Sequence, residues 1–442
     1  MHHQKAGNVT SELPDLGNFN FATEVFRLLK AVYGLRDAPR AWRIRLDREL
    51  RKLGGVPLCT DKALYCFYTD GKLDALLSTH VDDIKGAGTE TRTAAILAGL
   101  EAAFGKLKTQ FDSFLHCGLQ HSPLPEGGHK VDQHHYAQQL IAIDTTGLNM
   151  QDESTPLNQD YTSRYMSLLG GLSWLVQART DICIYVCALQ RAASKATNGH
   201  LLKLNKVTKW VRRKKCQLTF KPTKGEIVLA CVSDSAFKTE PFSSVAMRGT
   251  IIGIWCKATN VFHPIEYYSR KQRRVCRSTF AAELNGAADA VEVSRLINYT
   301  LTHMHNPKIT PTALMSLEES GQLPVPLILF TDCRSVYDTL SASDLRTPTE
   351  ASLVLIVAML RELLEKHAIQ AISWISTNDM VADGLTKGLI SRKGLLKLCN
   401  EGTWQILEES ATHSYGPRNN TEQPELFANA VLFLRNFCDS QV

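Results

Sequence analysis

The stretch Leu327–Ser335 reads LILFTDCRS and decides the fold of the second half of the chain. Its apolar run, Leu327 to Phe330, ends in an acid, Asp332. That order predicts a buried strand that delivers a carboxylate to the edge of a sheet. Because an Asp at a strand end can also cap a turn, this segment alone leaves its chemistry open.

Three more acids occur in comparable settings. Asp234 follows the apolar segment 226–233, Glu283 lies in the helical pattern 278–301, and Asp383 follows the predicted strand 368–376. Two strand-end acids and two helix acids are what a two-metal phosphodiesterase needs, because carboxylate oxygens suit Mg²⁺ or Mn²⁺. The alternative is four unrelated caps and surface acids among the 44 acidic residues of the chain.

Composition narrows the class of protein. With 442 residues, about two to four domains are expected. The net charge of +6 is compatible with a nucleic-acid partner. The 12 cysteines include no CxxC pair, which argues against structural zinc and favours reduced thiols in a cytoplasmic or nuclear protein that is not secreted. No apolar run has the length of a membrane span, so no membrane partner is expected.

The N-terminal part contains a helix and a hairpin. Segment 1–20 is polar and expected to be disordered, and a helix is predicted from Ala38 or Pro39 to about Leu53, with Pro in its first turn. Segments 63–69 and 74–88 flank an Asp-Gly pair and predict a β-hairpin. Its second arm carries Asp82 and Asp83, adjacent carboxylates that are costly to place without a cation. They indicate either a metal site or an ordinary acidic turn.

Several words of the sequence, in this order, resemble the Pol polyprotein of Ty1/copia-type LTR retrotransposons. YGLRDAPRAW (33–42) and HVDDIKGAG (80–88) are similar to words of the reverse transcriptase. KVDQHHYAQQL (130–140), STPL (154–157) and YMSLLGGLSWLVQARTDICIYV (165–186) are similar to segments that follow it. YYSRKQRRVCRSTFAAEL (267–284) and VADGLTKGL (381–389) are similar to words of the ribonuclease H domain.

The resemblance implies roles for the acids. It makes Asp234, Glu283, Asp332 and Asp383 the metal-binding acids of a ribonuclease H, and it makes the pair at 82 and 83 part of a polymerase metal site. Mg²⁺ or Mn²⁺ is the implied cofactor. There are departures: His80 stands where many members have Tyr or Phe, and Phe-Ala at 280–281 replaces the usual Thr-Glu.

A polymerase of this family needs a further Asp before the YGLRDAPRAW word. Only Asp15 precedes it here, in a polar context without a strand, so we expect a truncated reverse transcriptase that retains a primer–template surface but not DNA synthesis. The chain would then be a piece of a polyprotein from which the protease and the integrase are absent.

The expected fold class is α/β and α+β, multidomain. We expect a disordered lead-in (1–20), a partial reverse transcriptase palm with the start of a thumb (21–122), a thumb or connection (123–222) within a helical zone (89–222), a ribonuclease H-like α/β domain (223–390) and a C-terminal tail (391–442). In the ribonuclease H-like domain, the predicted strands are 226–233, 247–257, 261–269, 327–331 and 368–376, and the predicted helices are 278–301, 334–341, 350–366 and 378–389. Segment 303–325 is expected to be a loop, and 425–437 a small helix.

Basic side chains gather in three places: the start of the first helix, a basic amphipathic helix at 200–215, and the run 269–277. They are either solvated surfaces or contacts for nucleic-acid phosphates. The candidates are Arg36, Arg40, Lys209, Arg212, Arg213, Lys214, Arg270, Lys271 and Arg273. The histidines at 303, 305 and 367 are expected to be structural or exposed rather than catalytic.

The sequence thus predicts an endoribonuclease that cuts the RNA strand of RNA–DNA hybrids with little dependence on base sequence. The alternative is a catalytically dead nucleic-acid-binding relic, or a fragment that does not fold stably.

Overall fold

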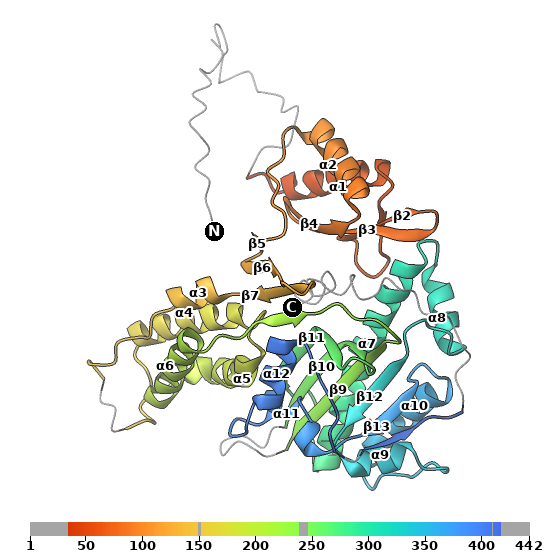
Figure 1. Ribbon diagram of the computed structural model, residues 1–442. Helices are drawn as coiled ribbons and strands as arrows, with labels where there is room; N and C mark the ends of the chain where they lie inside the picture. Colours follow the sequence, from red (N-terminus) through yellow and green to blue (C-terminus); the bar gives the residue numbers. More distant parts are fainter. Residues whose placement is uncertain (1–33, 149–151, 238–245, 409, 417–442) are drawn as a thin grey trace, which may run out of the picture.

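A computed structural model describes residues 34–148, 152–237, 246–408 and 410–416 (Figure 1). The lead-in 1–20, Asp15 and the predicted helix 425–437 lie outside these residues. Three units follow one another along the chain: an N-terminal unit (34–107), a middle unit (112–222) and a C-terminal unit (226–416). The described residues form three sheets together with helices. The expected mixed α and β fold class is therefore confirmed.

The N-terminal unit packs two helices on a four-stranded antiparallel sheet of order β1-β2-β3-β4. Asp70 and Gly71 both have positive φ, as a tight hairpin turn requires, so the predicted hairpin is confirmed. Its second arm is not one strand, because the chain reverses at Val81. The elements are α1 (Ala38–Lys52), β1 (Val56–Pro57), β2 (Leu64–Thr69), β3 (Lys72–His80), β4 (Asp83–Gly88) and α2 (Glu90–Phe104).

The middle unit is not wholly helical, so the predicted helical zone 89–222 is wrong in part. Four short strands form an antiparallel sheet of order β5-β6-β7-β8 beside four helices. Each strand has five residues or fewer, which is too short for alternation of apolar side chains to be recognised. The elements are β5 (Phe114–His116), β6 (Leu119–Pro123), β7 (His129–Asp132), α3 (His134–Gln139), α4 (Gln159–Leu175), α5 (Cys183–Ala192), α6 (Asn198–Arg213) and β8 (Leu218–Phe220).

The C-terminal unit is built on a six-stranded sheet of order β11-β10-β9-β12-β13-β14. The first three strands in the chain are antiparallel, β12 and β13 run parallel to β9, and β14 closes the edge in antiparallel pairing. The elements are β9 (Val228–Ala236), β10 (Met247–Cys256), β11 (Val261–Lys271), α7 (Thr279–His305), α8 (Pro311–Glu319), β12 (Leu327–Thr331), α9 (Arg334–Leu340), α10 (Val354–Glu365), β13 (Ala371–Trp374), α11 (Asp383–Thr386), α12 (Lys393–Glu401) and β14 (Ala411–His413).

Side chains alternate across β9 and thereby define the two faces of this sheet. Asp234 is paired with Gly249, above which α11 lies, whereas the next residue, Ser235, lies under α7 at Gly286. A Cβ atom at Gly249 would come within 2.7 Å of the Leu385 Cβ, so glycine is what allows α11 to approach the sheet this closely. The main core fills both faces and contains the Trp255, Phe262, Phe330 and Trp404 rings.

Several expectations for this unit need correction. Segment 303–325 is not a loop: α7 continues to His305, and α8 follows with Pro311 in its first turn and the Thr310 hydroxyl accepting a hydrogen bond from Ala313 N. The predicted helix 378–389 is instead a 3₁₀ turn (Thr377–Asp379) and the short α11. The sheet also continues beyond residue 390, because β14 pairs with β13.

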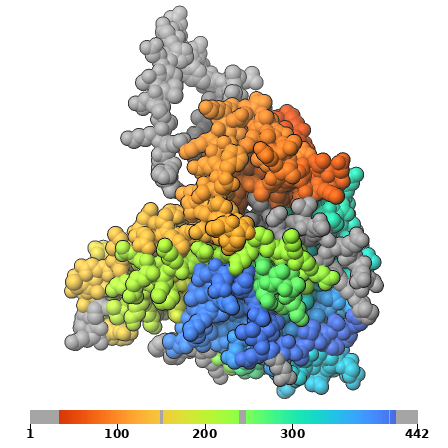
Figure 2. Space-filling view, in the orientation of Figure 1, coloured from red at the N-terminus to blue at the C-terminus, as the bar shows by residue number. Residues whose placement is uncertain are grey.

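The three units are joined by hydrogen bonds. The Tyr68 hydroxyl donates to Met304 O at 2.9 Å, which ties β2 to the end of α7. The Tyr267 hydroxyl lies 2.6 Å from Val176 O and links β11 to the middle unit. In Figure 2 the N-terminal unit, in orange, rests on the other two. Among the described residues, no helix combines the length and the apolar composition that crossing a lipid bilayer requires.

Candidate active site

Three acids from distant parts of the chain meet at one edge of the C-terminal sheet. Asp234 lies near the end of β9, Asp332 directly follows β12, and Asp383 begins α11. One carboxylate oxygen from each lies within 4.8 Å of the others. Because β9 and β12 are parallel neighbours, their carboxyl ends lie side by side, and this brings the first two acids together. We call these three residues the acid cluster.

Glu283, the fourth predicted acid, lies on α7 and is buried. It is not one of the three that share the 4.8 Å limit. Burial raises the pKa of its carboxyl first, and the negative charges of Asp234 and then of Cys333 and Asp332 raise it further. Glu283 therefore senses the charges of two members of the acid cluster, Asp234 and Asp332.

Burial and mutual repulsion govern the electrostatics of the acid cluster. Burial raises the pKa of Asp234 to about 6, and the charge of Asp383 adds to the effect. Burial also raises the pKa of Asp332 and of Asp383 above the ordinary value. Carboxylates held this close are costly unless a cation or hydrogen-bond donors compensate them.

Three donors from α11 and its surroundings compensate part of this charge. The Lys387 ammonium lies 3.5 Å from Asp234 Oδ1 and also donates to Asp383 Oδ1. The Thr386 hydroxyl donates to Asp234 Oδ2, and the Thr377 hydroxyl donates to Asp332 Oδ2 at 3.0 Å. Sequence reasoning missed Lys387, although its place four residues after Asp383 puts it on the same face of a helical turn.

The donor set fits a hard divalent cation. Every acidic ligand offers oxygen, and the three cluster carboxylates converge on a common space at the sheet edge. Oxygen-only sites suit Mg²⁺ and Mn²⁺, whereas no thiol or imidazole belongs to the group. One ammonium cannot neutralise all of these carboxylates, so the site has negative charge to offer to a metal ion.

Asp82 and Asp83 lie elsewhere, at the turn between β3 and β4, and both are exposed. Val81 before them has a φ of 54°, and its carbonyl accepts a hydrogen bond of 2.7 Å from the Trp42 indole of α1. A β-branched residue rarely adopts this conformation, so α1 holds the turn in an unusual geometry. Within the described ranges, no third His, Cys, Asp or Glu joins this pair in a metal-type group.

The predicted nucleic-acid residues are all exposed, in three separate places. One pair lies at the start of α1, four residues lie on or directly after α6, and three follow one another around the end of β11. Exposure is what phosphate contact requires, and it equally fits a solvated surface. The residues are Arg36, Arg40, Lys209, Arg212, Arg213, Lys214, Arg270, Lys271 and Arg273.

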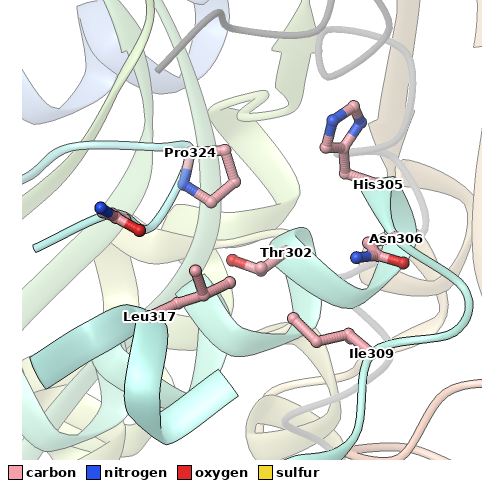
Figure 3. A pocket seen from close by; sticks show the side chains of 7 residues that line it. Thr302, His305, Asn306, Ile309, Leu317 and Pro324 are labelled. Atoms are coloured by element: carbon pink, nitrogen blue, oxygen red, sulfur yellow. The ribbon is translucent and has the colours of Figure 1, made fainter. Parts of the chain in front are cut away.

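Two of the predicted histidines, His303 and His305, lie at the C-terminal end of α7. His303 is buried, and its Nδ1 accepts a hydrogen bond from Cys59 N at 3.0 Å, which ties the end of α7 to the N-terminal unit. A pocket of about 220 Å³ opens between α7 and α8, and Figure 3 shows His305 at its wall. None of the four predicted acids lines this pocket.

Comparisons with known proteins give the class of protein first. Residues 14–158 match the family model described as reverse transcriptase (RNA-dependent DNA polymerase). The N-terminal unit and part of the middle unit, with the Asp-Asp turn, therefore correspond to a reverse transcriptase segment.

Curated relatives then extend the similarity over most of the chain. The chain is 25% identical over 401 residues to a "Retrovirus-related Pol polyprotein from transposon RE2" of Arabidopsis thaliana. This match covers 87% of this chain and 25% of that protein. The corresponding protein from transposon RE1 is 25% identical over 378 residues, covering 83% of this chain and 24% of that protein. The chain is thus a relative of copia-type retrotransposon Pol polyproteins, as its sequence words indicate, and it spans about a quarter of the length of these relatives.

Proposed function

We propose that the chain hydrolyses the RNA strand of RNA–DNA hybrids in a metal-dependent reaction of the ribonuclease H type. The observation that carries this proposal is the convergence of Asp234, Asp332 and Asp383 at the carboxyl edge of two parallel strands. The three antiparallel strands that lead into these parallel strands agree with the ribonuclease H-like domain expected for residues 223–390.

In this proposal, the acid cluster and Glu283 hold Mg²⁺ or Mn²⁺. When bound, such ions supply an activated water and stabilise the leaving 3′ oxygen. The protein's own part is to fix the carboxylates. Thr377 orients the Asp332 carboxylate, Thr386 orients that of Asp234, and Gly249 lets α11 bring Asp383 to the sheet. A ready-made geometry of this kind reduces the reorganisation that the reaction requires.

The partner in this proposal is a nucleic-acid duplex. The basic residues of α6 and those around the end of β11 would contact backbone phosphates, which gives affinity without base specificity. Choice of the hybrid would rest on its A-like shape and on the 2′-hydroxyl. The N-terminal unit would contribute primer–template contacts through α1, with Asp82 and Asp83 as part of a polymerase metal site.

The proposal is tested by incubating the purified chain with RNA labelled at one end and annealed to DNA, in Mg²⁺ or in EDTA. We expect cleavage of the RNA strand in Mg²⁺ alone, and none of single-stranded RNA or of double-stranded DNA. The Asp332→Asn variant is expected to be inactive. The matched control is Asp160→Asn, because Asp160 is an exposed acid of α4 that forms an ion pair with Arg164. A folded protein that binds the hybrid but does not cut it would favour the nucleic-acid-binding relic.

A further inference from the structure

Lys387 is the one basic group that the structure places within hydrogen-bonding distance of the acid cluster, among the residues described. Its ammonium is shared between Asp234 and Asp383, which are the same carboxylates that would ligate a metal ion. The Asp234 side chain is 1% exposed and that of Lys387 is 30% exposed, so the ammonium enters the cluster from the solvent side. It therefore stands where a cation would reach two of the three acids.

The backbone that carries Lys387 is held in place from two units. The Arg392 guanidinium donates to Lys387 O at 2.9 Å and stacks over the Tyr185 ring, with 4.6 Å to the ring centroid. The Tyr185 hydroxyl in turn donates to Gly388 O at 2.8 Å. Since Tyr185 belongs to α5 of the middle unit, contacts between units fix the point from which the lysine reaches the cluster.

We propose that the Lys387 ammonium is a built-in cation that occupies one cation position of the acid cluster while the metal is absent, and that divalent metal ions displace it. This inference rests on the proposed function. It makes Lys387 a positioning residue with two effects. It keeps the buried carboxylates compensated in the metal-free protein, and it lowers the affinity of the cluster for divalent ions, because each ion must compete with a tethered charge.

The flexible four-carbon stem of lysine makes such an exchange possible. The ammonium is a compact, strongly hydrated charge, and the partial exposure of the side chain leaves it a path to solvent. Its displacement would remove one positive charge from the cluster at the moment when a doubly charged ion arrives. The carboxylates of Asp234 and Asp383 would then be available to the metal ion.

The test measures metal binding apart from catalysis. Metal-free full-length chain, its Lys387→Met variant and a Lys366→Met control are titrated with Mg²⁺ while thermal unfolding is followed, and free Mn²⁺ is counted by electron paramagnetic resonance. Lys366 suits as the control because its ammonium also contacts a carboxylate, that of Glu362, in an exposed ion pair at the end of α10. Without metal, Lys387→Met is expected to melt below wild type. Its half-saturating Mg²⁺ concentration is expected to fall about tenfold, as loss of a competing charge near the ligands implies.

The outcomes separate the inference from the function on which it rests. Equal Mg²⁺ midpoints for wild type and Lys387→Met, with hybrid cleavage by wild type, would overturn the inference and leave the proposed function standing. Absence of any response to Mg²⁺ or Mn²⁺, together with absence of cleavage, would overturn both. If Lys387→Met does not fold without metal, Lys387→Gln, which keeps a donor but not the charge, replaces it, and the same shift in midpoint is expected.

Discussion

Asp234→Asn provides a quantitative test of the electrostatics of the acid cluster. Burial raises the pKa of Asp234 from 3.8 to about 6, which means that the folded protein holds a proton that the unfolded chain has released. With one pKa unit worth about 1.4 kcal/mol, the ionised carboxylate destabilises the metal-free fold by at most about 3 kcal/mol above pH 6. That shift already includes the compensating contacts of Lys387 and Thr386. Because the Asn amide fits the hydrogen-bonding site of a carboxyl imperfectly, the net gain in the free energy of unfolding is expected to be about 1–2 kcal/mol.

The direction of the pH dependence follows from the same shift. Between about pH 4 and 6 the folded state binds more protons than the unfolded state, so the stability of the metal-free wild type falls as pH rises through this window. The Asn variant has no carboxyl at position 234 to bind this proton. Its free energy of unfolding should therefore change less than that of wild type between about pH 4 and 6. The raised pKa values of Asp332 and Asp383 act in the same direction. Burial, their largest cause, is common to both proteins, whereas the contribution of the Asp234 charge to the pKa of Asp332 is lost in the variant.

The assay is urea unfolding in EDTA at a series of pH values, followed by tryptophan fluorescence, since Trp255 and Trp404 lie in the core of the C-terminal unit. At pH 8 without metal, Asp234→Asn should be the more stable protein. Saturating Mg²⁺ should reverse the order, because only wild type gains the full ligand set. Asp160→Asn should follow wild type throughout. If Asp234→Asn were less stable than wild type at pH 8 in EDTA, the reasoning from buried, repelling carboxylates would be refuted.

Three further predictions follow from the packing and the surface. Gly249→Ala should lower the free energy of unfolding by about 1–3 kcal/mol and reduce hybrid cleavage, because its Cβ would collide with α11. The control is Gly170→Ala, where a Cβ has open space, and it should change neither quantity in denaturation and cleavage assays. Trp404→Ala should lower the free energy of unfolding in urea by about 3–5 kcal/mol, because this indole packs on Trp255 and Phe330 and donates to a backbone carbonyl. A loss below about 1 kcal/mol would exclude residues beyond 390 from the folded unit. Replacing Arg212, Arg213 and Lys214 by Ala should weaken hybrid binding. In a filter-binding series, the slope of log K against log salt concentration should become shallower by up to about three units. An unchanged slope would mean that these side chains form a solvated surface and do not contact phosphates.

The sequence was informative wherever a strongly apolar strand ended in an acid. The LILFTDCRS stretch forms β12 and places Asp332 after it, as predicted. The same reasoning placed Asp234 just past its strand, whereas β9 runs to Ala236 and includes it, because pairing with β10 continues through Ala236. The identity of the acids that meet could therefore be predicted, but their distances depend on strand pairing that a single sequence does not contain.

Other features were hidden because they depend on tertiary contacts. Lys387 is one lysine among the 50 basic residues of the chain, and only the folded position of α11 brings it to the acids. Strand β14 has three residues and no apolar alternation, and its pairing with β13 defines it. Helix α8 lies in a polar segment, and its stability comes from contacts such as the ion pair of Arg295 with Glu318. Tertiary packing overrides local sequence preference at each of these places.

The account's central claim is that acids from three distant segments form one catalytic metal centre. It is tested most directly by measuring Mg²⁺-dependent cleavage of an RNA–DNA hybrid by wild type, Asp234→Asn, Asp332→Asn and Asp383→Asn in parallel, each shown to be folded. The account predicts cleavage by wild type and a loss of at least about a hundredfold in every variant, since each removes a charged ligand of the same centre. Cleavage by any one variant at the rate of wild type would contradict the claim that its carboxylate belongs to the centre.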